Sequence, residues 1–344
     1  MNWKIFSVHD FAHHRDAWNR LNATGPNSPL LHSDFVEPLL RIFGSGKELI
    51  AIYGELLDPQ AMTLLTSPHF STWQTFQPSQ LPIGLWINRA DLPLDRLLHK
   101  LSKALPGIVL ILSIYQQDPD FYKRPENSIH LTTLDYVLTA KVQINGNFEQ
   151  YWSQRGKNLR QNLNRQRNRL QRENVAVRLE TLTDPATVAA AIHDYGKLES
   201  AGWKAREGTA IHSHNTQGQF YTAVLDNFCR RGMGRIYRYW YHDKLVATDL
   251  CIQQDSVLVI LKTTYDETIN TSSPAMLMRH DYFKSIFDED LIHTIEFYGR
   301  VMEWHSKLTD DIRMLYHINY YPWPSLKRMY YLLKKFQDSK ELKP

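Results

Sequence analysis

The chain has very few cysteines. Cys229 and Cys251 are the only two among 344 residues, and no CxxC pair occurs. Two isolated thiols exclude the disulfide framework of a small secreted domain and argue against structural zinc. We therefore expect reduced thiols inside a cytoplasmic protein that binds no metal.

Long apolar runs are missing as well. The longest runs, among them Ile108–Leu112, are far shorter than the roughly 18 residues that a membrane span requires. The segment Met1–Trp18 carries His, Asp and Arg where a signal peptide needs an uninterrupted apolar stretch. These absences predict neither secretion nor insertion into a bilayer.

The remaining composition is that of an ordinary folded protein, with 43% apolar residues, 22% charged residues, 15 Gly and 16 Pro. It excludes collagen-like and disordered chains. At roughly 100 to 200 residues per domain, the length predicts two domains, each able to bury its own core.

Basic residues are concentrated in one segment. The formal net charge is +4, yet Arg155–Arg172 alone contains seven basic residues and no acidic one. A solvated helix face fits this pattern, and so does a surface for phosphates of nucleic acid, anionic lipid or a nucleotide-like cofactor. Apolar residues recur at helical spacing and predict a helix that docks by one side with its arginines outward: Trp152, Leu159, Leu163 and Leu170.

The second half of the chain alternates between strand and helix patterns. Strands are expected at 175–181, 235–241, 245–253, 256–264, 293–298 and 312–320, and helices at 184–200, 217–231, 273–287 and 302–308. The order is therefore β, α, α, β, β, β, α, β, α, β. An amphipathic helix at 325–336 follows, either packed on the domain or, with its flanking lysines and arginine, lying on a membrane surface.

The first half repeats this order at an offset of roughly 180 residues, without evident sequence identity. Strands are expected at 3–8, 48–53, 61–65, 83–87, 108–114 and 136–142, and helices at 14–21, 34–43 and 94–104. We expect an α/β protein with mixed sheets and two domains, 1–145 and 146–344, the second including the basic segment 148–173.

Several familiar motifs fail on inspection. The stretch 44–47 lacks both the earlier glycine and the final Ser or Thr of a P-loop, and 232–234 lies between a helix and a strand, the reverse of a dinucleotide fingerprint. Neither GxSxG nor HExxH occurs, and His212 and His214 have no acidic pair beside them. A metal site is not expected.

Three residues can be proposed for acid and base chemistry. Asp249 interrupts an apolar strand, where a carboxylate needs either a function or an arginine partner. Tyr298 ends a strand and could protonate a leaving group, or simply be a rim aromatic. Glu303 lies one turn into the next helix, as a base or as an exposed carboxylate.

The order of elements is that of the GNAT acyltransferase fold, and short motifs sharpen the likeness. They are the Arg-rich helix around 158–170, Gly202-Trp203-Lys204, Thr264-Tyr265-Asp266 leading to Ser273-Pro274, and Phe297-Tyr298-Gly299. Within that superfamily the chain resembles the CelD-like acetyltransferases associated with polysaccharide biosynthesis, which are related to Fem-type aminoacyl transferases with two GNAT-like domains.

This resemblance implies that an acyl-CoA, commonly acetyl-CoA, lies where the fourth and fifth strands of the second half separate. Its pantetheine would pair with 256–264, including Thr263, and its pyrophosphate would meet the N–H groups of Ser273, Ala275, Met276 and Leu277. Trp203, Lys204 and Tyr265 would face the acceptor, which would attack the thioester directly. The acceptor would be an amine or hydroxyl of a small molecule or glycan precursor.

The chain also departs from the pattern. Residues 271–276 read TSSPAM and lack the glycines of the usual pyrophosphate loop, Val301 replaces a glycine, and Lys307 is displaced by one position. Two alternatives therefore stay open: aminoacyl transfer from charged tRNA, with the Arg155–Arg172 helix facing the tRNA, or a catalytically inactive GNAT-like scaffold. DNA is not expected as a partner.

Overall fold

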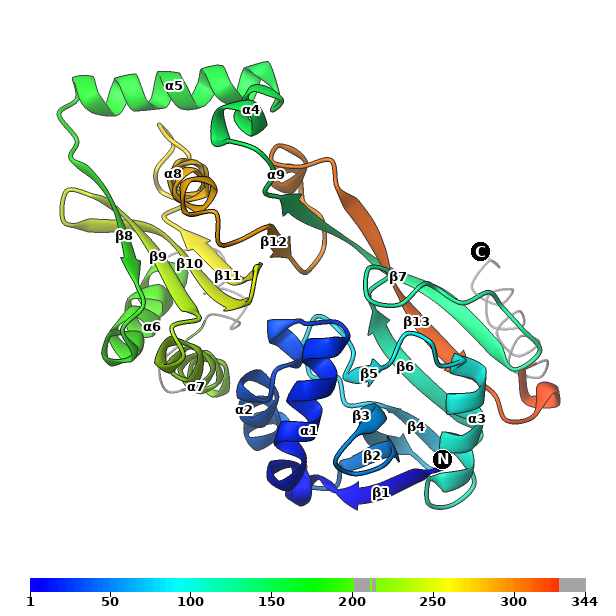
Figure 1. The fold of residues 1–344 in the computed structure, drawn as a ribbon. Helices are drawn as coiled ribbons and strands as arrows, with labels where there is room; N and C mark the ends of the chain where they lie inside the picture. The colour runs from blue at the N-terminus through cyan, green and yellow to red at the C-terminus, as the bar shows by residue number, and fades with distance from the viewer. Residues whose placement is uncertain (201–210, 212–214, 328–344) are drawn as a thin grey trace, which may run out of the picture. The chain divides into compact units, whose positions relative to one another are not determined.

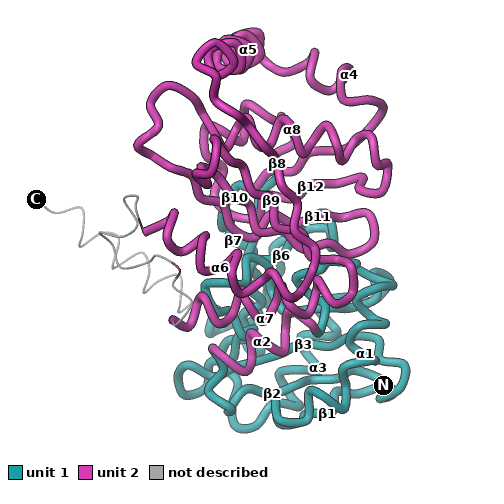
Figure 2. The backbone as a smooth tube through the Cα atoms, turned by 90° about the vertical axis from the view of Figure 1, so that its left-hand side faces the viewer, with its two compact units in different colours: residues 1–33, 43–138, 313–344 teal, residues 34–42, 139–312 magenta. Residues whose placement is uncertain are grey.

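The computed structural model describes residues 1–200, 211 and 215–327. The chain divides into two compact units, coloured separately in Figure 2. Unit 1 comprises Met1–Ser33, Phe43–Leu138 and the chain from Arg313 onward; unit 2 comprises Asp34–Ile42 and Thr139–Ile312. The predicted domain boundary between residues 145 and 146 stays a prediction. The compact units are not continuous in sequence, because residues 34–42 belong to unit 2 and the chain from Arg313 onward belongs to unit 1.

Unit 1 is built on a mixed sheet whose strand order is β1-β2-β3-β4-β6-β13. Its strands are β1 (Trp3–Ser7), β2 (Leu49–Gly54), β3 (Pro59–His69), β4 (Thr72–Thr75), β5 (Trp86–Asn88), β6 (Ile111–Gln117), the first part of β7 (Leu131–Gln143) and nearly all of β13 (Ile312–Tyr320). Its helices are α1 (Phe11–Thr24) and α3 (Leu94–Ala104), with short 3-10 turns at Val8–Asp10 and Pro29–Leu31. The pair β4 and β6 is parallel, and β5 pairs with β3.

The core of unit 1 follows from the spacing of leucines in α3. Leu97, Leu98 and Leu101 recur at helical intervals and are almost fully buried. They pack in one cluster with Trp3 and Trp86, and the Trp3 indole donates to the carbonyl of Leu97 at 2.9 Å. The predicted helix at 94–104 is therefore confirmed as a core helix.

Unit 2 is built on a second mixed sheet with the order β7-β12-β11-β10-β9-β8. Its strands are β8 (Val177–Leu182), β9 (Gly234–Tyr241), β10 (Lys244–Gln254), β11 (Val257–Tyr265), β12 (Thr294–Phe297) and the last part of β7. Its helices are α2 (Ser33–Phe43), α4 (Phe148–Ser153), α5 (Lys157–Arg172), α6 (Pro185–Ser200), α7 (Thr216–Arg230), α8 (Pro274–Glu289) and α9 (Glu303–Ser306) (Figure 1).

The two sheets share one arrangement. In each, four antiparallel strands in chain order are followed by a fifth strand parallel to the fourth: β6 beside β4, and β12 beside β11. A sixth antiparallel strand completes each sheet, β13 in unit 1 and β7 in unit 2. The expected repetition of the strand and helix order is therefore present in the structure.

Helices cover both faces of the sheet in unit 2. Arg238 of β9 donates to Asp194 of α6 at 3.0 Å, whereas the next residue, Tyr239, donates to Asp281 of α8 at 2.7 Å. Because successive side chains of a strand point to opposite faces, α6 and α8 lie on opposite sides of the sheet. The aromatic stack of Tyr237 on Tyr282, with ring centroids 4.0 Å apart, lies on the α8 side.

Local expectations were met with a few exceptions. The hairpin turns predicted at 242–243 and 254–255 contain His242 and Asp255 with φ of 51° and 46°, the left-handed conformation of tight turns. The strand β4 was not expected from its sequence TWQT, and the strand expected at 83–87 is the shorter β5. Both cysteines are buried and free, as expected.

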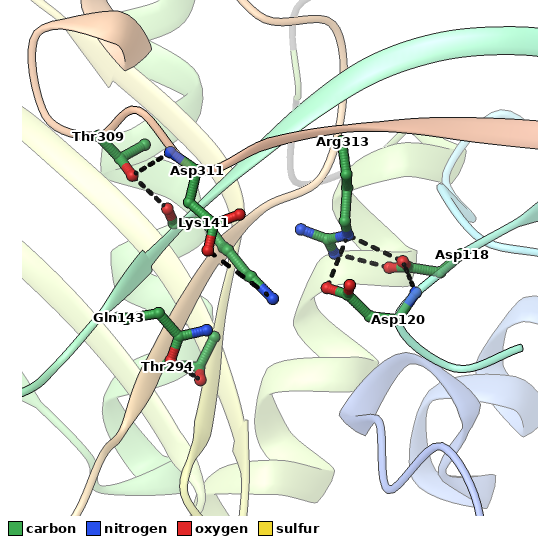
Figure 3. A network of polar contacts seen from close by, with 8 residues as sticks. All are labelled: Asp118, Asp120, Lys141, Gln143, Thr294, Thr309, Asp311 and Arg313. Atoms are coloured by element: carbon green, nitrogen blue, oxygen red, sulfur yellow. Dashed lines mark hydrogen bonds and ion pairs between the residues drawn. The ribbon is translucent and has the colours of Figure 1, made fainter. Parts of the chain in front are cut away.

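Polar contacts fix the chain on either side of residue 312 (Figure 3). In unit 2, the Thr309 hydroxyl donates to the Lys141 carbonyl at 2.6 Å, and the N–H of Asp311 donates to that hydroxyl at 3.0 Å. In unit 1, Arg313 forms a bidentate ion pair with buried Asp118, with donor to acceptor distances of 2.8 and 2.6 Å. Specific polar contacts therefore hold the sixth strand in place, β7 in unit 2 and β13 in unit 1.

Candidate functional site

A cavity of about 710 Å³ opens in unit 2 between α5, α8, α9 and the end of β11. Five residues that the sequence placed at a donor or acceptor site line it: Thr263, Tyr265, Ser273, Ala275 and Met276. Further lining residues come from α5 and from α9, including Asn158, Asn162, Trp304 and Lys307. The cavity thus brings together chain segments that are more than 100 residues apart in the sequence.

The fourth and fifth strands of unit 2 separate beside this cavity. The parallel ladder of β11 and β12 ends at the pair Val259 and Glu296, although β11 continues to Tyr265. The register between β10 and β11 also shifts after Leu250, which leaves Leu261 as an extra residue in β11. Such a bulge bends and twists a strand. The backbone of β11 beyond Val259 is consequently not paired with β12.

The N-terminus of α8 is less open than expected. The N–H of Ser273 donates to the side-chain carbonyl of Gln166 at 2.8 Å, and those of Met276 and Leu277 both donate to the Ser273 carbonyl at 3.0 Å. Of the four amides expected to bind a pyrophosphate, Ala275 alone donates to no residue that the structure describes. Leu277 is fully buried and does not line the cavity.

The basic helix α5 docks as its apolar spacing predicted. Leu163, Gln166 and Leu170 are buried, and Arg167 pairs with Asp281 and His280 of α8. Arg167 is therefore half-buried against α8, which corrects the expectation that all the arginines point outward. Three other cations of this helix are exposed and have no acidic partner among the residues that the structure describes: Lys157, Arg165 and Arg172.

Asp249 is fully buried and paired with an arginine. The Nε and Nη2 atoms of Arg279 donate to its two carboxylate oxygens at 3.0 and 3.1 Å, and the Tyr282 hydroxyl donates to the same carboxylate at 2.8 Å. Asp249 does not itself line the cavity, whereas Arg279 does. The proposed acid or base role of Asp249 stays a prediction, and its position favours an indirect one.

Tyr298 and Glu303 lie outside the cavity lining. Tyr298 follows the end of β12 and is half-buried. Glu303 is exposed and pairs with Lys307 at 2.9 Å, and hydrogen bonding to that ammonium lowers the pKa of its carboxyl below the ordinary value. A lowered pKa weakens a general base at neutral pH. Trp203 and Lys204, as well as His212 and His214, lie outside the described residues.

Sequence reasoning missed Gln166, Arg279 and Trp304. In the sequence, Gln166 does not differ from the other polar residues of α5, and only the packing shows that it caps α8. Arg279 carried a usable signal, because the residues one helical turn before and after it, such as Met276 and Phe283, are apolar, and Asp249 likewise lies in an apolar strand. Two opposite charges in buried elements predict each other as partners.

The described part of the chain lacks both a membrane-spanning helix and a cluster of metal-binding side chains. No described helix is long and apolar enough to cross a membrane. Within the described ranges, no group of three or more His, Cys, Asp or Glu residues could hold a metal ion. His305 is buried beside Trp304, and burial lowers its pKa to about 4, so the imidazole is neutral at physiological pH.

Comparison with known proteins bears on the fold of the chain. A family model described as an acetyltransferase (GNAT) domain matches residues 157–306. The fold is similar to that of FemX, with 10% identity, coverage of 92% of this chain and 97% of that one, and a TM-score of 0.58. No curated protein matches the chain.

Two further solved structures have a similar fold. One is the C-terminal domain (DUF2156) of a putative lysylphosphatidylglycerol synthetase from Agrobacterium fabrum, with 11% identity, coverage of 90% and 91%, and a TM-score of 0.55. The other is L-PGS from Bacillus licheniformis, with 12% identity, coverage of 89% and 91%, and a TM-score of 0.50. The mixed α/β fold with two GNAT-like domains is thereby confirmed, and residues 157–306 match the model of a GNAT acetyltransferase domain.

Proposed function

We propose that unit 2 transfers an acyl group from acyl-CoA to an amine or hydroxyl of a small molecule or glycan precursor. The observation that carries this proposal is the cavity beside the separated end of β11, lined by Thr263, Ala275 and Met276. Backbone N–H and C=O groups of β11 beyond Val259 can pair with the amides of a pantetheine arm. The acceptor then attacks the thioester carbonyl directly.

Unit 1 is proposed to be a degenerate partner. Its fourth strand is interrupted between β4 and β5, and the intervening Gly84 donates from its N–H to the Gln116 carbonyl at 2.9 Å. A Cβ at Gly84 would lie 2.0 Å from the Tyr115 carbonyl oxygen, so this segment packs directly against β6. The first turn of α3 carries the acidic side chain of Asp95, which repels an anionic group.

The donor site can be tested by introducing such a charge. Ala275→Glu is expected to weaken acetyl-CoA binding by about 100-fold, because a carboxylate replaces a methyl group beside an α8 amide that donates to no described residue. Thermal unfolding with acetyl-CoA, longer acyl-CoAs and free CoA measures binding, since a ligand at 100 times its Kd stabilises by about 2.7 kcal/mol. Gln161→Glu, on the exposed face of α5, is the charge-matched control. Equal affinity of the two variants would refute the placement.

A second candidate is aminoacyl transfer from charged tRNA. It is favoured by Gln166, whose carbonyl already holds the Ser273 N–H that a pyrophosphate would use. The exposed cations Lys157, Arg165 and Arg172 give α5 an outer face for a phosphate backbone. The similar folds of FemX and of the lysylphosphatidylglycerol synthetase domain are consistent with this candidate.

Reversing this exposed charge separates the two candidates. The triple variant Lys157→Glu, Arg165→Glu and Arg172→Glu is expected to weaken tRNA binding strongly and to lower the slope of log Kd against log salt by about 2 to 3. Acetyl-CoA binding should be unchanged. A triple reversal of exposed cations outside α5, at Arg178, Arg230 and Lys284, is the control. An equal loss of tRNA binding in both triple variants would show that the effect comes from the overall charge and not from α5. If the protein binds none of the donors, the scaffold hypothesis is favoured.

A further inference from the structure

Arg279 is a buried cation that nevertheless reaches the cavity. Only 3% of its surface is exposed, yet it lines the cavity from the second turn of α8. Arginine is rarely buried to this degree unless it is paired. Burial lowers its pKa while the neighbouring Asp249 carboxylate raises it, and the net direction is upward, so the guanidinium stays charged.

Its orientation is fixed from three sides. Asp249 accepts two hydrogen bonds, from Nε and Nη2, and the Thr263 hydroxyl of β11 accepts another from Nη2. The guanidinium carbon lies 4.1 Å from the centroid of the Trp304 ring, a cation–π contact. The remaining nitrogen, Nη1, makes no hydrogen bond to a residue that the structure describes. Its two N–H groups belong to a side chain that lines the cavity.

The contact with Thr263 places this group next to the part of β11 that is not paired with β12. That segment is where the proposed donor would lie. A fixed donor of hydrogen bonds in a buried site stabilises charge that develops during a reaction without reorganising. A permanently anionic ligand would be stabilised less by this guanidinium, because Asp249 already balances its charge. The arrangement therefore suits an oxygen that becomes negative only in the transition state.

We propose that Arg279 is a catalytic residue whose Nη1 donates to the carbonyl oxygen of the bound acyl donor, with Asp249 and Trp304 as positioning residues. The inference rests on the proposed function of unit 2. A lone pair of the acceptor forms a bond to the carbonyl carbon while the C=O π electrons move to the oxygen. Collapse of this oxyanion reforms C=O and breaks the bond to the carrier, and the carrier leaves with the electron pair and takes up the proton that the acceptor loses.

Arg279→Lys and Arg279→Ala test this role. We expect kcat for acyl transfer, or for donor hydrolysis with water as acceptor, to fall by about 100-fold or more. The Kd for acetyl-CoA or aminoacyl-tRNA should change by less than about threefold, because the carbonyl interaction strengthens in the transition state. Guanidinium chloride should restore part of the kcat of Arg279→Ala. Arg235→Lys is the matched control, since Arg235 pairs with Glu289 of the same helix outside the cavity.

A second variant tests the same role in case Arg279→Ala does not fold. Trp304→Leu keeps the ion pair of Arg279 with Asp249 and removes the cation–π contact, together with the contacts of the Trp304 ring to Phe297 and His305, and it should lower kcat by about tenfold. A wild-type protein that neither binds nor consumes any donor would contradict the proposed function itself. A wild-type protein that turns over, together with full kcat in Arg279→Lys and Trp304→Leu, would overturn the role of Arg279.

Discussion

Asp249→Ala is expected to lower the free energy of unfolding by about 3–5 kcal/mol, the usual cost of removing one partner of a buried ion pair. Asp249 is fully buried and accepts hydrogen bonds from Arg279 and Tyr282. Without this carboxylate, the guanidinium keeps its charge inside unit 2 and the Tyr282 hydroxyl loses its acceptor. Urea unfolding followed by tryptophan fluorescence and circular dichroism measures the loss.

Two further variants show whether burial is the cause. Asp249→Asn keeps the shape and one acceptor oxygen but not the charge, so its loss should be intermediate. Glu173→Ala removes an exposed pair with Arg169 on α5, in which both side chains are 43% exposed, and should change stability by less than about 1 kcal/mol. Similar small losses for Asp249→Ala and Glu173→Ala would contradict the assignment of Asp249 to the core.

Much of the secondary structure followed from local pattern. The helix at 94–104 and the strand at 312–320 were predicted to the residue, because each carries a regular apolar spacing between clear end signals. The strand β4 was missed because TWQT is short and half-buried, without an apolar alternation that differs from loop sequence. Pairing with β3 and β6, which sequence spacing does not encode, makes it a strand.

The grouping of segments into units could not be read from local pattern. Residues 34–42 lie early in the chain but group with unit 2, where Phe35 packs edge-on against Phe220, with ring centroids 5.3 Å apart. The strand β13 comes last among the strands but completes the sheet of unit 1. Such exchanges depend on which apolar faces meet across long sequence separations, and a prediction from continuous halves cannot include them.

The candidate site was predicted in part. The positions expected to surround a donor, such as Thr263, Ser273 and Met276, do line one cavity, because a strand end and the next helix start meet at one edge of the sheet. The chemistry at that edge could not be predicted. It depends on Gln166, which comes from another helix, and on Arg279, which the prediction from local pattern did not single out.

Arg313→Ala is expected to lower the free energy of unfolding by about 3–5 kcal/mol, through unit 1. Arg313 is 8% exposed and Asp118 has no exposed surface. The guanidinium bridges β13 to the segment after β6, and it also pairs with Asp120 at 3.0 Å. Removing it leaves the Asp118 carboxylate buried without its cation, at the strand that enters unit 1 from the distant end of the sequence (Figure 3).

An exposed pair in the same unit provides the matched control for this prediction. Arg89 and Asp58 lie at a similar distance, 2.7 Å, but their side chains are 43% and 73% exposed. Arg89→Ala should therefore change stability by less than about 1 kcal/mol, since water replaces the lost partner. Arg313→Lys should fall between the two alanine variants, because an ammonium keeps the charge but not the bidentate geometry. If Arg313→Ala and Arg89→Ala lowered the free energy of unfolding equally, the result would contradict a role of Arg313 in holding β13 in its sheet.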